Sequence, residues 1–529
     1  MFDKNFAPQI AYLPAQDRDL IRRAYLFAKN SHQGQKRTSG EPYITHPLAV
    51  ATQLSKMRFD GQMISAAFLH DTVEDTPVTL KQIQRKFGKD IAGLVDGITK
   101  LSRVRLNKTW FGLGPIKKEK LPELIRQIET LKKMFLAMSR DIRVVIIKII
   151  DRLHNMQTIK FLPVEKQIRI ASETLQIFAP LASRLGMGEI KGQLEDLAFL
   201  IIYPKESQEL EKQVKHERMR RKKIVDKNIR ALYRLFAKKK FQPISLHGRV
   251  KHRWSLYRKL LRYDNDLSKI YDLIAIRVIV ENIDECYGAL GLIHERWRPL
   301  PGRIKDYIAL PKPNGYSSLH TTVFGPGGNI IEIQIRTQLM HEQAEYGIAA
   351  HWQYKEPTEQ APRYSLFRQR KWASFPKQAS GYSPSWNKEN TKISQYLRKI
   401  FPENEKGIKW LKDLVRVQKA IKDPQELAKT LKLDFFSDRI FVFTPAGDVK
   451  DLPAGASPID FAYSVHSELG HHYGGARVNG KIAASNFCLK NGDICEIIKN
   501  KKGQPKPDWL AVVKTSNARQ KIKRAIKEK

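Results

Sequence analysis

The spacing of apolar residues changes near residue 241, and this change predicts two kinds of fold in one chain. Up to residue 200, apolar residues recur every three or four positions, as on one face of a helix. Beyond 241, the segments 317–325 and 330–337 alternate apolar and polar residues, and 273–280 is a short β-branched run, all typical of strands. We therefore expect an all-helical domain followed by a mixed α/β domain. The expected helices cover 19–30, 48–57, 61–69, 80–87 and 140–153 in the first domain and 284–297 in the second.

A third pattern, short strands and turns around one helical segment, predicts a small β-grasp module near the C-terminus. With 529 residues and about 150 residues per domain, three or four domains are expected. The fold class is therefore multidomain, α and α/β. The expected division is a helical domain (1–200, with a loop at 104–122), a basic helical linker (201–240), the α/β domain (241–355), a linker with a helix at 406–431 (356–432), the β-grasp module (433–498) and a basic tail (499–529).

The charge of the chain points to a polyanionic partner. Lys and Arg number 94 against 54 Asp and Glu, so the formal charge is +40. Such an excess repels itself unless the protein meets nucleic acid, ribosome, nucleotide phosphates or an anionic membrane surface. Residues 211–240 contribute 13 basic against 3 acidic side chains, and residues 499–529 contribute 11 against 2. Residues 211–240 could form a solvated helical face, or they could contact a polyanion.

The cysteines and the hydropathy of the chain indicate where in the cell the protein is expected. The three cysteines, Cys286, Cys488 and Cys495, form no CxxC pair, which excludes a disulfide framework and a thiolate zinc site. The longest apolar runs fall far short of the roughly 20 residues that a membrane span needs. The N-terminal segment has no signal-peptide pattern. We expect a cytoplasmic protein with no membrane partner.

One segment of the helical domain has the residue types of a metal site. An apolar helix ends in four ionisable side chains, His70, Asp71, Glu74 and Asp75, which helical spacing places one turn apart in pairs. Their charge is costly against an apolar helix unless a divalent cation or water offsets it, and mixed His and carboxylate ligands suit manganese, iron or zinc better than calcium. His46 and Asp151, on other helices, could close around the same point. A solvated helix end is the alternative, and spacing alone leaves both open.

The α/β domain has no P-loop, but basic residues cluster beside its strands. Strand alternation places Glu332, Gln334 and Arg336 on one face of 330–337, which is either exposed or the wall of a site. Asp272, which opens the run 273–280, and Glu332 could offer oxygen ligands to Mg²⁺, or could be surface carboxylates. The segments 247–259 and 301–320 supply Arg249, Lys251, His252, Arg253, Arg303, Lys305, Lys312, Tyr316 and His320.

Three runs of the first domain resemble the HD-type hydrolase domain of the RelA/SpoT homologue family. These are HQGQKRTSGEPYITHPLAVA (32–51), HDTVEDT (70–76) and MFLAMSRDIRVVIIKIIDRLHNMQT (134–158). The resemblance implies that the 3′-pyrophosphate of ppGpp or pppGpp is hydrolysed at a metal, typically Mn²⁺. It departs from the family at the 104–122 loop and at Ile150, where a small residue is common. The implied roles are metal ligands His46, His70, Asp71 and Asp151, water-activating Glu74 and Asp75, and nucleotide-binding Arg37 and Asn155.

The second domain resembles the nucleotidyltransferase-like (p)ppGpp synthetase domain of the same family, over about 245–355. The matching runs include GRVKHRWSLYRK, YDLIAIRVIV, PGRIKDYIALPKPNGYSSLHTT and EIQIRTQLMHEQAEYGIAAHW. The resemblance implies transfer of pyrophosphate from ATP to the 3′-OH of GDP or GTP, with basic Arg303-Ile304-Lys305-Asp306 typical of bifunctional members. The implied roles are Mg²⁺ binding by Asp272, metal assistance or 3′-OH activation by Glu332, ATP contacts by Arg249, Lys251, Arg277 and Lys312, guanine stacking by Tyr316, and phosphate contacts by Lys305 and His320.

Residues 441–482 resemble a TGS domain, the β-grasp module that follows the synthetase in long family members. There a histidine after the helix can contact the unacylated CCA end of tRNA, and His466 is at the matching place; a core or surface histidine is the alternative. Long members continue beyond this module, so the resemblance implies a form shortened after the TGS domain.

Taken together, the motifs favour a bifunctional enzyme that makes and hydrolyses (p)ppGpp in the stringent response. Because the two activities together would waste ATP, reciprocal switching between the sites is expected. Two other hypotheses remain: a synthetase whose hydrolase half is impaired, and a non-enzymatic tRNA- or ribosome-binding protein.

Overall fold

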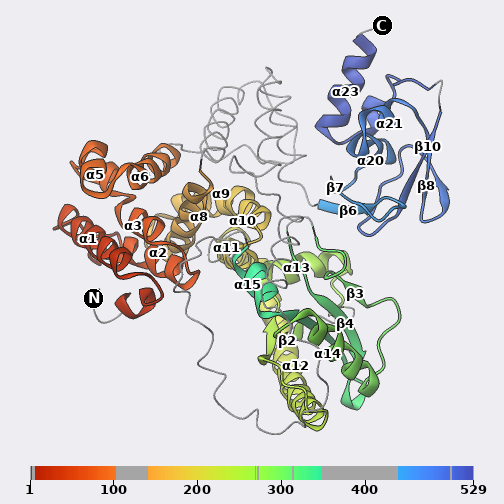
Figure 1. Cartoon of the computed structure of the whole chain (residues 1–529), viewed down its shortest axis with the longest axis horizontal. Helices are drawn as coiled ribbons and strands as arrows, with labels where there is room; N and C mark the ends of the chain where they lie inside the picture. The colour runs from red at the N-terminus through yellow and green to blue at the C-terminus, as the bar shows by residue number, and fades with distance from the viewer. Residues whose placement is uncertain are drawn as a thin grey trace, which may run out of the picture.

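The structure is a computed structural model, and it describes residues 2, 6–102, 141–267, 270, 273–312, 315–347, 439–500 and 503–527. The first part of the chain is built of helices, as its periodicity predicts (Figure 1). They bury Ile21, Leu54, Phe68, Val95 and Ile147 in a common core. The helices are α1 (Ala15–Ser31), α2 (Thr45–Lys56), α3 (Gly61–Leu69), α4 (Thr72–Asp75), α5 (Leu80–Phe87), α6 (Lys89–Ser102), α8 (Ile142–Gln157), α9 (Val164–Glu173), α10 (Ala179–Arg184) and α11 (Gly188–Ile202).

Side-chain caps begin several of these helices. Asp60 accepts a hydrogen bond from the Met63 amide at the start of α3, and Asp141 accepts one from the Arg143 amide at the start of α8. One local expectation was wrong: the HD segment is not a single helix, because α3 ends at Leu69 and His70 and Asp71 form a turn before α4. The Asp75 amide still donates to the Asp71 carbonyl, so these two residues remain one turn apart.

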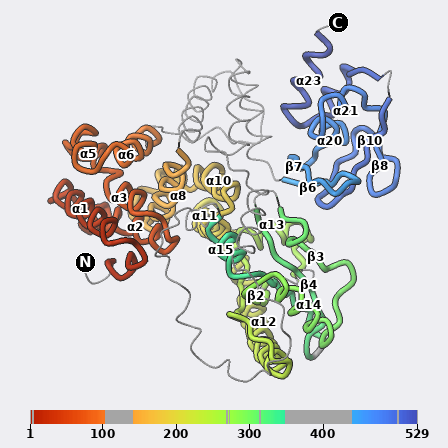
Figure 2. Tube along the Cα trace, viewed as in Figure 1, coloured from red at the N-terminus to blue at the C-terminus, as the bar shows by residue number. Residues whose placement is uncertain are grey.

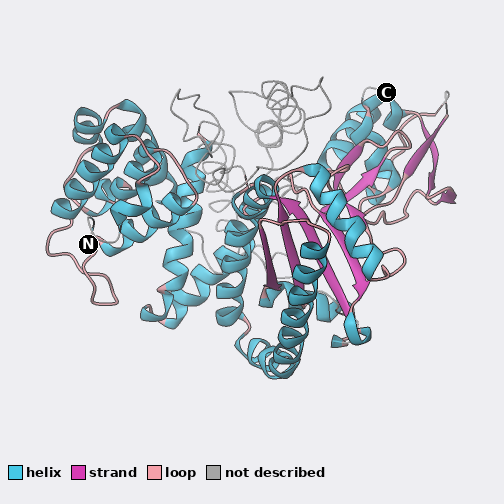
Figure 3. Cartoon of the chain, turned by 60° about the horizontal axis from the view of Figure 1, so that its bottom comes forward, coloured by secondary structure: helices cyan, strands magenta, loops and turns pink. Residues whose placement is uncertain are grey.

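A five-stranded sheet forms the second domain, in the order β1-β2-β5-β4-β3 (Figure 3). Strands β2 and β5 are parallel and the other neighbours are antiparallel, and α14 (Ile283–Arg296) follows β2. The buried residues Ile276, Val278, Ile333 and Ile335 join the two central strands to the core. The strands are β1 (Ser245–Val250), β2 (Ile274–Val280), β3 (Lys305–Asp306), β4 (Leu319–Phe324) and β5 (Ile330–Thr337).

Helix α12 (Pro204–Lys238) does more than link the two domains. It buries Leu210, Val214, Val225, Leu232 and Phe236 in the core of the sheet domain, beside β1 and β2. The segment expected as a basic linker is therefore also a structural helix of that domain, because its apolar residues recur on one face while its basic residues lie on the other.

The helical domain meets the sheet domain along α11, which contacts α13 (Arg253–Arg262) and α15 (Gln338–Tyr346) (Figure 2). Glycines allow the backbones to approach closely here. A Cβ on Gly188 would lie 2.5 Å from the Ala344 carbonyl oxygen, and one on Gly192 would lie 2.3 Å from the His252 ring. Gly347 has a φ of +64°, and a Cβ there would collide with the Leu185 carbonyl.

The C-terminal module has the expected β-grasp elements. A parallel bridge from Phe443 to Ile494 joins the hairpin β6–β7 to the sheet β10-β8-β9. The basic tail is not a free extension, because Trp509, Val513 and Ile522 lie in the core of this module. The elements are β6 (Arg439–Phe443), β7 (Val449–Pro453), α20 (Pro458–Val465), α21 (Ser467–His471), β8 (Tyr473–Val478), β9 (Lys481–Ala483), β10 (Cys495–Lys499), α22 (Trp509–Val512) and α23 (Ser516–Lys527).

Some expectations lie outside the described residues: the 104–122 loop, the 356–432 linker with its helix at 406–431, and Asp272. Among the described residues, no helix combines the length and apolar character that crossing a bilayer requires.

Candidate active sites

Four predicted metal ligands converge from three places in the helical domain. His46 lies in the first turn of α2, His70 and Asp71 form the turn after α3, and Asp151 lies within α8. Donor atoms of His46, His70 and Asp151 lie within 4.8 Å of one another. The Asp71 carboxylate lies 3.1 Å from His70 Nε2 and 3.5 Å from His46 Nε2. All four side chains are buried, so the cluster is no solvated helix end.

Hydrogen bonds aim one nitrogen of each histidine at the centre of the cluster. His70 Nδ1 lies 2.7 Å from the Ala67 carbonyl oxygen, which only an N–H can satisfy. His46 Nδ1 lies 2.8 Å from His154 Nδ1, which also accepts from Arg37 at 2.9 Å, so the proton between the two histidines is on His46. Both Nε2 atoms therefore face the carboxylates, the orientation typical of metal-binding histidines, and a bound cation would replace any proton that they carry.

The electrostatics of the cluster favour a cation. Burial opposes the charge of His70, but the adjacent Asp71 outweighs burial and raises the pKa of His70 to about 9. Burial also opposes ionisation of Asp71, yet His70 holds the pKa of this carboxyl well below its usual range. Two carboxylates and two imidazole nitrogens at this spacing fit a divalent cation with nitrogen and oxygen ligands. The donor set does not distinguish manganese from iron or zinc.

The predicted water-activating residues lie beside the cluster. Asp75 is exposed and Glu74 half-buried on α4. The Tyr43 hydroxyl lies 2.9 Å from an Asp71 oxygen and 2.7 Å from an Asp75 oxygen, and so connects the ligand to the candidate base. Burial, together with both carboxylates, raises the pKa of Tyr43 far above its usual range, so it stays a hydrogen-bond donor.

A cavity of about 380 Å³ opens next to the cluster and is lined by basic side chains. Arg37 donates to the Asn155 and Thr158 side chains, each at 3.2 Å, and Asn155 donates to Asp151 at 2.6 Å. The predicted nucleotide-binding pair, Arg37 and Asn155, thus lies on the wall of a cavity that reaches a predicted metal ligand. The other basic lining residues are Lys148, Arg152 and Arg169.

The second candidate site lies on the sheet, around Glu332 of β5. His320 on β4 lies 3.4 Å from the Glu332 carboxylate, and Gln334 donates to the same oxygen at 2.9 Å. The Tyr316 hydroxyl lies 2.6 Å from His320 Nε2. Burial lowers the pKa of His320, so at neutral pH this ring is a neutral partner of the carboxylate. His320 and Gln334 therefore orient the Glu332 carboxylate, which can act as a proton acceptor.

Lys312 and the tyrosines form the next part of this site. The Lys312 ammonium lies over the rings of Tyr307 and Tyr316, 4.5 Å and 4.9 Å from their centroids. Burial, with Lys305 nearby, lowers the pKa of Lys312 to about 8. A buried ammonium with a lowered pKa gains from an anionic ligand, which restores its charged form.

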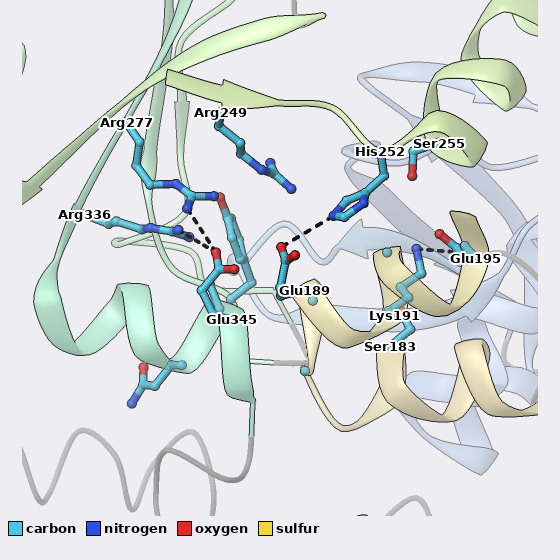
Figure 4. Close-up of a pocket in the computed structure, with 16 residues that line it drawn as sticks. Ser183, Glu189, Lys191, Glu195, Arg249, His252, Ser255, Arg277, Arg336 and Glu345 are labelled. Carbon is cyan, nitrogen blue, oxygen red and sulfur yellow. Dashed lines mark hydrogen bonds and ion pairs between the residues drawn. The ribbon is translucent and has the colours of Figure 1, made fainter. Parts of the chain in front are cut away.

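An arginine-lined cavity of about 220 Å³ adjoins this cluster, between the sheet and α11 (Figure 4). Arg277 and Arg336 are buried, and both pair with one Glu345 oxygen, at 3.2 Å and 3.0 Å. Burial and the neighbouring Arg336 lower the pKa of Arg277 to about 10. Because two guanidiniums share one carboxylate and Arg249 faces the same space, the cavity holds surplus positive charge suited to phosphates.

The remaining predicted residues are less enclosed. Lys251 is half-buried after β1, and Arg303 and Lys305 are exposed at the edge strand β3. Exposed His466 ends α20, where its Nδ1 accepts a hydrogen bond from the Glu468 amide at 3.3 Å. It is thus a surface histidine that caps α21. Its Nε2 is not used by this cap, so the cap is compatible both with a tRNA contact and with a purely structural role.

Comparisons with known proteins match each of the three domains. Residues 24–188 match an HD domain, residues 248–359 match the region found in RelA / SpoT proteins, and residues 440–499 match a TGS domain. A GTP pyrophosphokinase of Myxococcus xanthus is 41% identical over 517 residues, which cover 98% of this chain and 61% of the relative. The chain belongs to the RelA/SpoT homologue family.

Other relatives in this family are named for hydrolysis or for both synthesis and hydrolysis. A probable guanosine-3′,5′-bis(diphosphate) 3′-pyrophosphohydrolase of Synechocystis is 42% identical and covers 96% of this chain and 60% of its own length. The bifunctional (p)ppGpp synthase/hydrolase SpoT of Escherichia coli is 40% identical, with 98% and 66% covered. The chain therefore spans about three fifths to two thirds of the length of these RelA/SpoT homologues.

Sequence reasoning missed several residues that line the two sites of this RelA/SpoT homologue. His154 follows Asp151 by three helical positions, a spacing that could have revealed it. Arg336 shares the polar face of β5 with Glu332, and that face proved to be buried rather than exposed. Tyr43 and Glu345 carry no local signal, because each reaches its partners only through tertiary packing.

Proposed function

We propose that this RelA/SpoT homologue synthesises and hydrolyses (p)ppGpp at two separate sites. The observation that carries the proposal is a buried His/Asp cluster beside a basic cavity in one domain, together with an oriented carboxylate beside an arginine-lined cavity in the other. A purely RNA-binding protein has no use for two such sites.

In the hydrolytic half, His46, His70, Asp71 and Asp151 would hold a divalent cation, with Mn²⁺ as the proposed ion. When bound, such a cation acidifies a water molecule and stabilises negative charge on phosphate. Asp75 or Glu74 takes the proton of the attacking water, and Tyr43 holds the Asp75 carboxylate in place. Arg37 and Asn155 orient the guanosine, while Lys148 and Arg152 line the cavity toward the phosphates. The products are GDP or GTP and pyrophosphate.

In the synthetic half, positioning and charge neutralisation supply most of the catalysis. Arg249, Arg277 and Lys312 contact ATP, and we add Arg336 from its place in the same cavity. Tyr316 stacks on guanine, and Glu332 accepts the proton of the 3′-OH that attacks the β-phosphorus of ATP, with AMP as the leaving group. Asp272 and Glu332 would bind Mg²⁺, while Lys251, Arg303, Lys305 and His320 complete the phosphate surroundings.

Two incubations test the proposal. Purified protein is given ATP, GDP and Mg²⁺ in one tube and ppGpp with Mn²⁺ in another, and nucleotides are separated by chromatography. We expect ppGpp in the first tube and GDP with pyrophosphate in the second. Synthesis alone would support the impaired-hydrolase hypothesis and direct attention to Ile150, a core residue that precedes Asp151. No turnover in either tube would refute the proposal.

A contact with tRNA is a second candidate function, supported by exposed His466 at the end of α20 in the TGS domain. The test is binding of unacylated and aminoacylated tRNA to the parent protein and to His466→Ala. Loss of preference for the unacylated form in the variant is expected, and equal binding of both forms by the parent would count against this function.

A further inference from the structure

Helix α12 presents a row of basic side chains that neither candidate site uses. Lys223, Lys227, Arg230, Arg234 and Lys238 are exposed. They follow one another every three or four residues, which places them on one stripe of the helix. At 1.5 Å per residue the row is about 22 Å long. The opposite side of α12 is buried in the core of the sheet domain, so the orientation of the row is set by packing.

The charge of this row is not balanced by its own helix. Residues 222–238 contain six basic side chains and one acidic side chain, Asp226. The two acidic residues of α12 that lie nearest before the row have other partners: Glu217 pairs with Arg220 and Arg221, and Glu211 pairs with Arg218. Within the described ranges, no ion pair is found for the five members of the row. Like charges one turn apart destabilise a helix, so a bound anion would stabilise this one.

From this placement we infer that the row binds the phosphodiester backbone of a nucleic acid. Phosphates follow one another every few ångströms along a strand, so a straight row of this length meets several of them at once. Tyr233 is 47% exposed beside Arg230 and Arg234 and offers a ring to a ribose or base. A formal charge of +40 on the chain attracts the same partner at longer range.

A membrane surface fits this helix less well. Helices that lie on membranes insert an apolar face between the lipids. The apolar face of α12, with Val225, Leu232 and Phe236, is already buried in the protein core. No member of the row lines either cavity, so this binding surface is independent of nucleotide turnover.

Salt-dependent binding tests the inference on the full chain. The probe is a fluorescently labelled duplex RNA of about 20 base pairs, titrated between about 50 and 200 mM KCl. The variant Lys223→Gln/Lys227→Gln/Arg230→Gln/Arg234→Gln removes four charges and keeps residues that favour helix. We expect affinity at low salt to fall at least about 100-fold, and the slope of log K against log salt to decrease by roughly three to four.

The matched control changes four exposed basic residues of the helical domain, Lys56, Lys81, Arg85 and Lys89, to Gln. It carries the same charge change, so we expect it to keep the parent slope. Duplex DNA of the same sequence separates the two sources of phosphodiester: equal loss on both duplexes means recognition of the charged backbone, and loss on RNA alone means recognition of its A-form geometry. Both outcomes support the inference.

Vesicles containing phosphatidylserine are a third probe, which tests a membrane surface as the partner. Three results would overturn the inference. The α12 variant could bind duplex with the parent's affinity and slope, the control variant could lose as much duplex binding as the α12 variant, or the α12 variant could lose binding to the vesicles only. Circular dichroism and the melting temperature show whether each variant is folded. Because the readout is binding, a failed turnover assay leaves this test intact.

Discussion

Single side chains in the helical domain bring two buried carboxylates together with cationic partners: Lys148 lies 2.7 Å from Asp151, and His70 lies 3.1 Å from Asp71. Asp71 and Asp151 are buried, and the Nε2 atoms of His46 and His70 face them. The pKa of Asp151 is held well below its usual range: its burial is opposed by Lys148, and His46 adds to this effect. Residues that stay ionised inside a protein are costly unless paired. A bound divalent cation would therefore stabilise this pair of buried carboxylates.

The first prediction concerns Asp71. Asp71→Asn removes one negative charge from the cluster, and we expect Mn²⁺ affinity to fall by at least about tenfold and ppGpp hydrolysis by at least about 100-fold. Calorimetric titration of the metal and a chromatographic assay measure the two effects. Asp96→Asn, the same change at a half-buried position of α6 that pairs with exposed Lys100, is the control and keeps both. Unchanged metal affinity in Asp71→Asn would show that the cluster is structural.

The second prediction concerns Arg336. Arg336→Lys keeps the charge but loses the planar guanidinium that pairs with Glu345, and we expect kcat/KM for synthesis to fall at least about tenfold. Arg296→Lys, at the end of α14, is the control. Melting curves show whether stability changed. If folded Arg336→Lys protein had the same kcat/KM as the parent, Arg336 would not contact the substrate.

At the scale of elements, helix α12 shows how one segment serves two environments. Leu232 is fully buried while its neighbours Tyr233 and Arg234 are exposed. The apolar side stabilises the sheet domain, and the basic side remains in solvent. A helix with this division of residues cannot be exchanged for a flexible linker without exposing the core.

The third prediction follows from that division. Leu232→Ala should lower the stability of the sheet domain by about 2–5 kcal/mol, because it leaves a cavity in the core. Leu261→Ala, at a position 55% exposed on α13, should change it by less than about 0.5 kcal/mol. Denaturant unfolding followed by the tryptophan fluorescence of the chain, to which Trp254 and Trp297 of this domain contribute, measures the difference. Equal midpoints would mean that α12 does not support this core.

At the scale of the whole molecule, α11 joins the helical domain to the candidate site of the sheet domain. His252, at the start of α13, pairs with Glu189 at 3.5 Å (Figure 4). It also pairs with Asp196 at 3.1 Å, and Asp196 accepts a hydrogen bond from the Trp254 amide. Glu189 lines the arginine cavity of the sheet domain although it belongs to the helical domain. Changes at this contact therefore reach the synthetic site directly.

The fourth prediction concerns the pH dependence of this contact. Hydrogen bonds to Asp196 and Glu189 raise the pKa of His252 to about 9, against about 6.5 when unfolded. A raised pKa stabilises the folded state fully below pH 6.5, and this contribution is lost as the pH rises through 9. We expect His252→Gln to melt below the parent at pH 6, and at the same temperature at pH 10. A constant difference would contradict the role of the charge.

The sequence by itself determined the classes of structure and the residue types of both sites. Helical and strand periods are local properties of the chain, so α8, α12 and β5 could be assigned before any fold was known. Motif resemblance identified His46, His70 and Asp151, whose donor atoms do converge. The roles of the predicted residues remain to be tested.

Only the tertiary structure decided which distant groups meet. The Tyr43 link between Asp71 and Asp75, the carboxylate that Arg277 and Arg336 share, and the α11 contact with His252 join segments far apart in sequence. The turn at His70 and Asp71 also departed from the helical spacing expected for the ionisable side chains after Leu69, because tertiary contacts of only two residues decide it. Such contacts depend on how whole elements pack, and apolar spacing records which face of an element is buried but not which partner covers it.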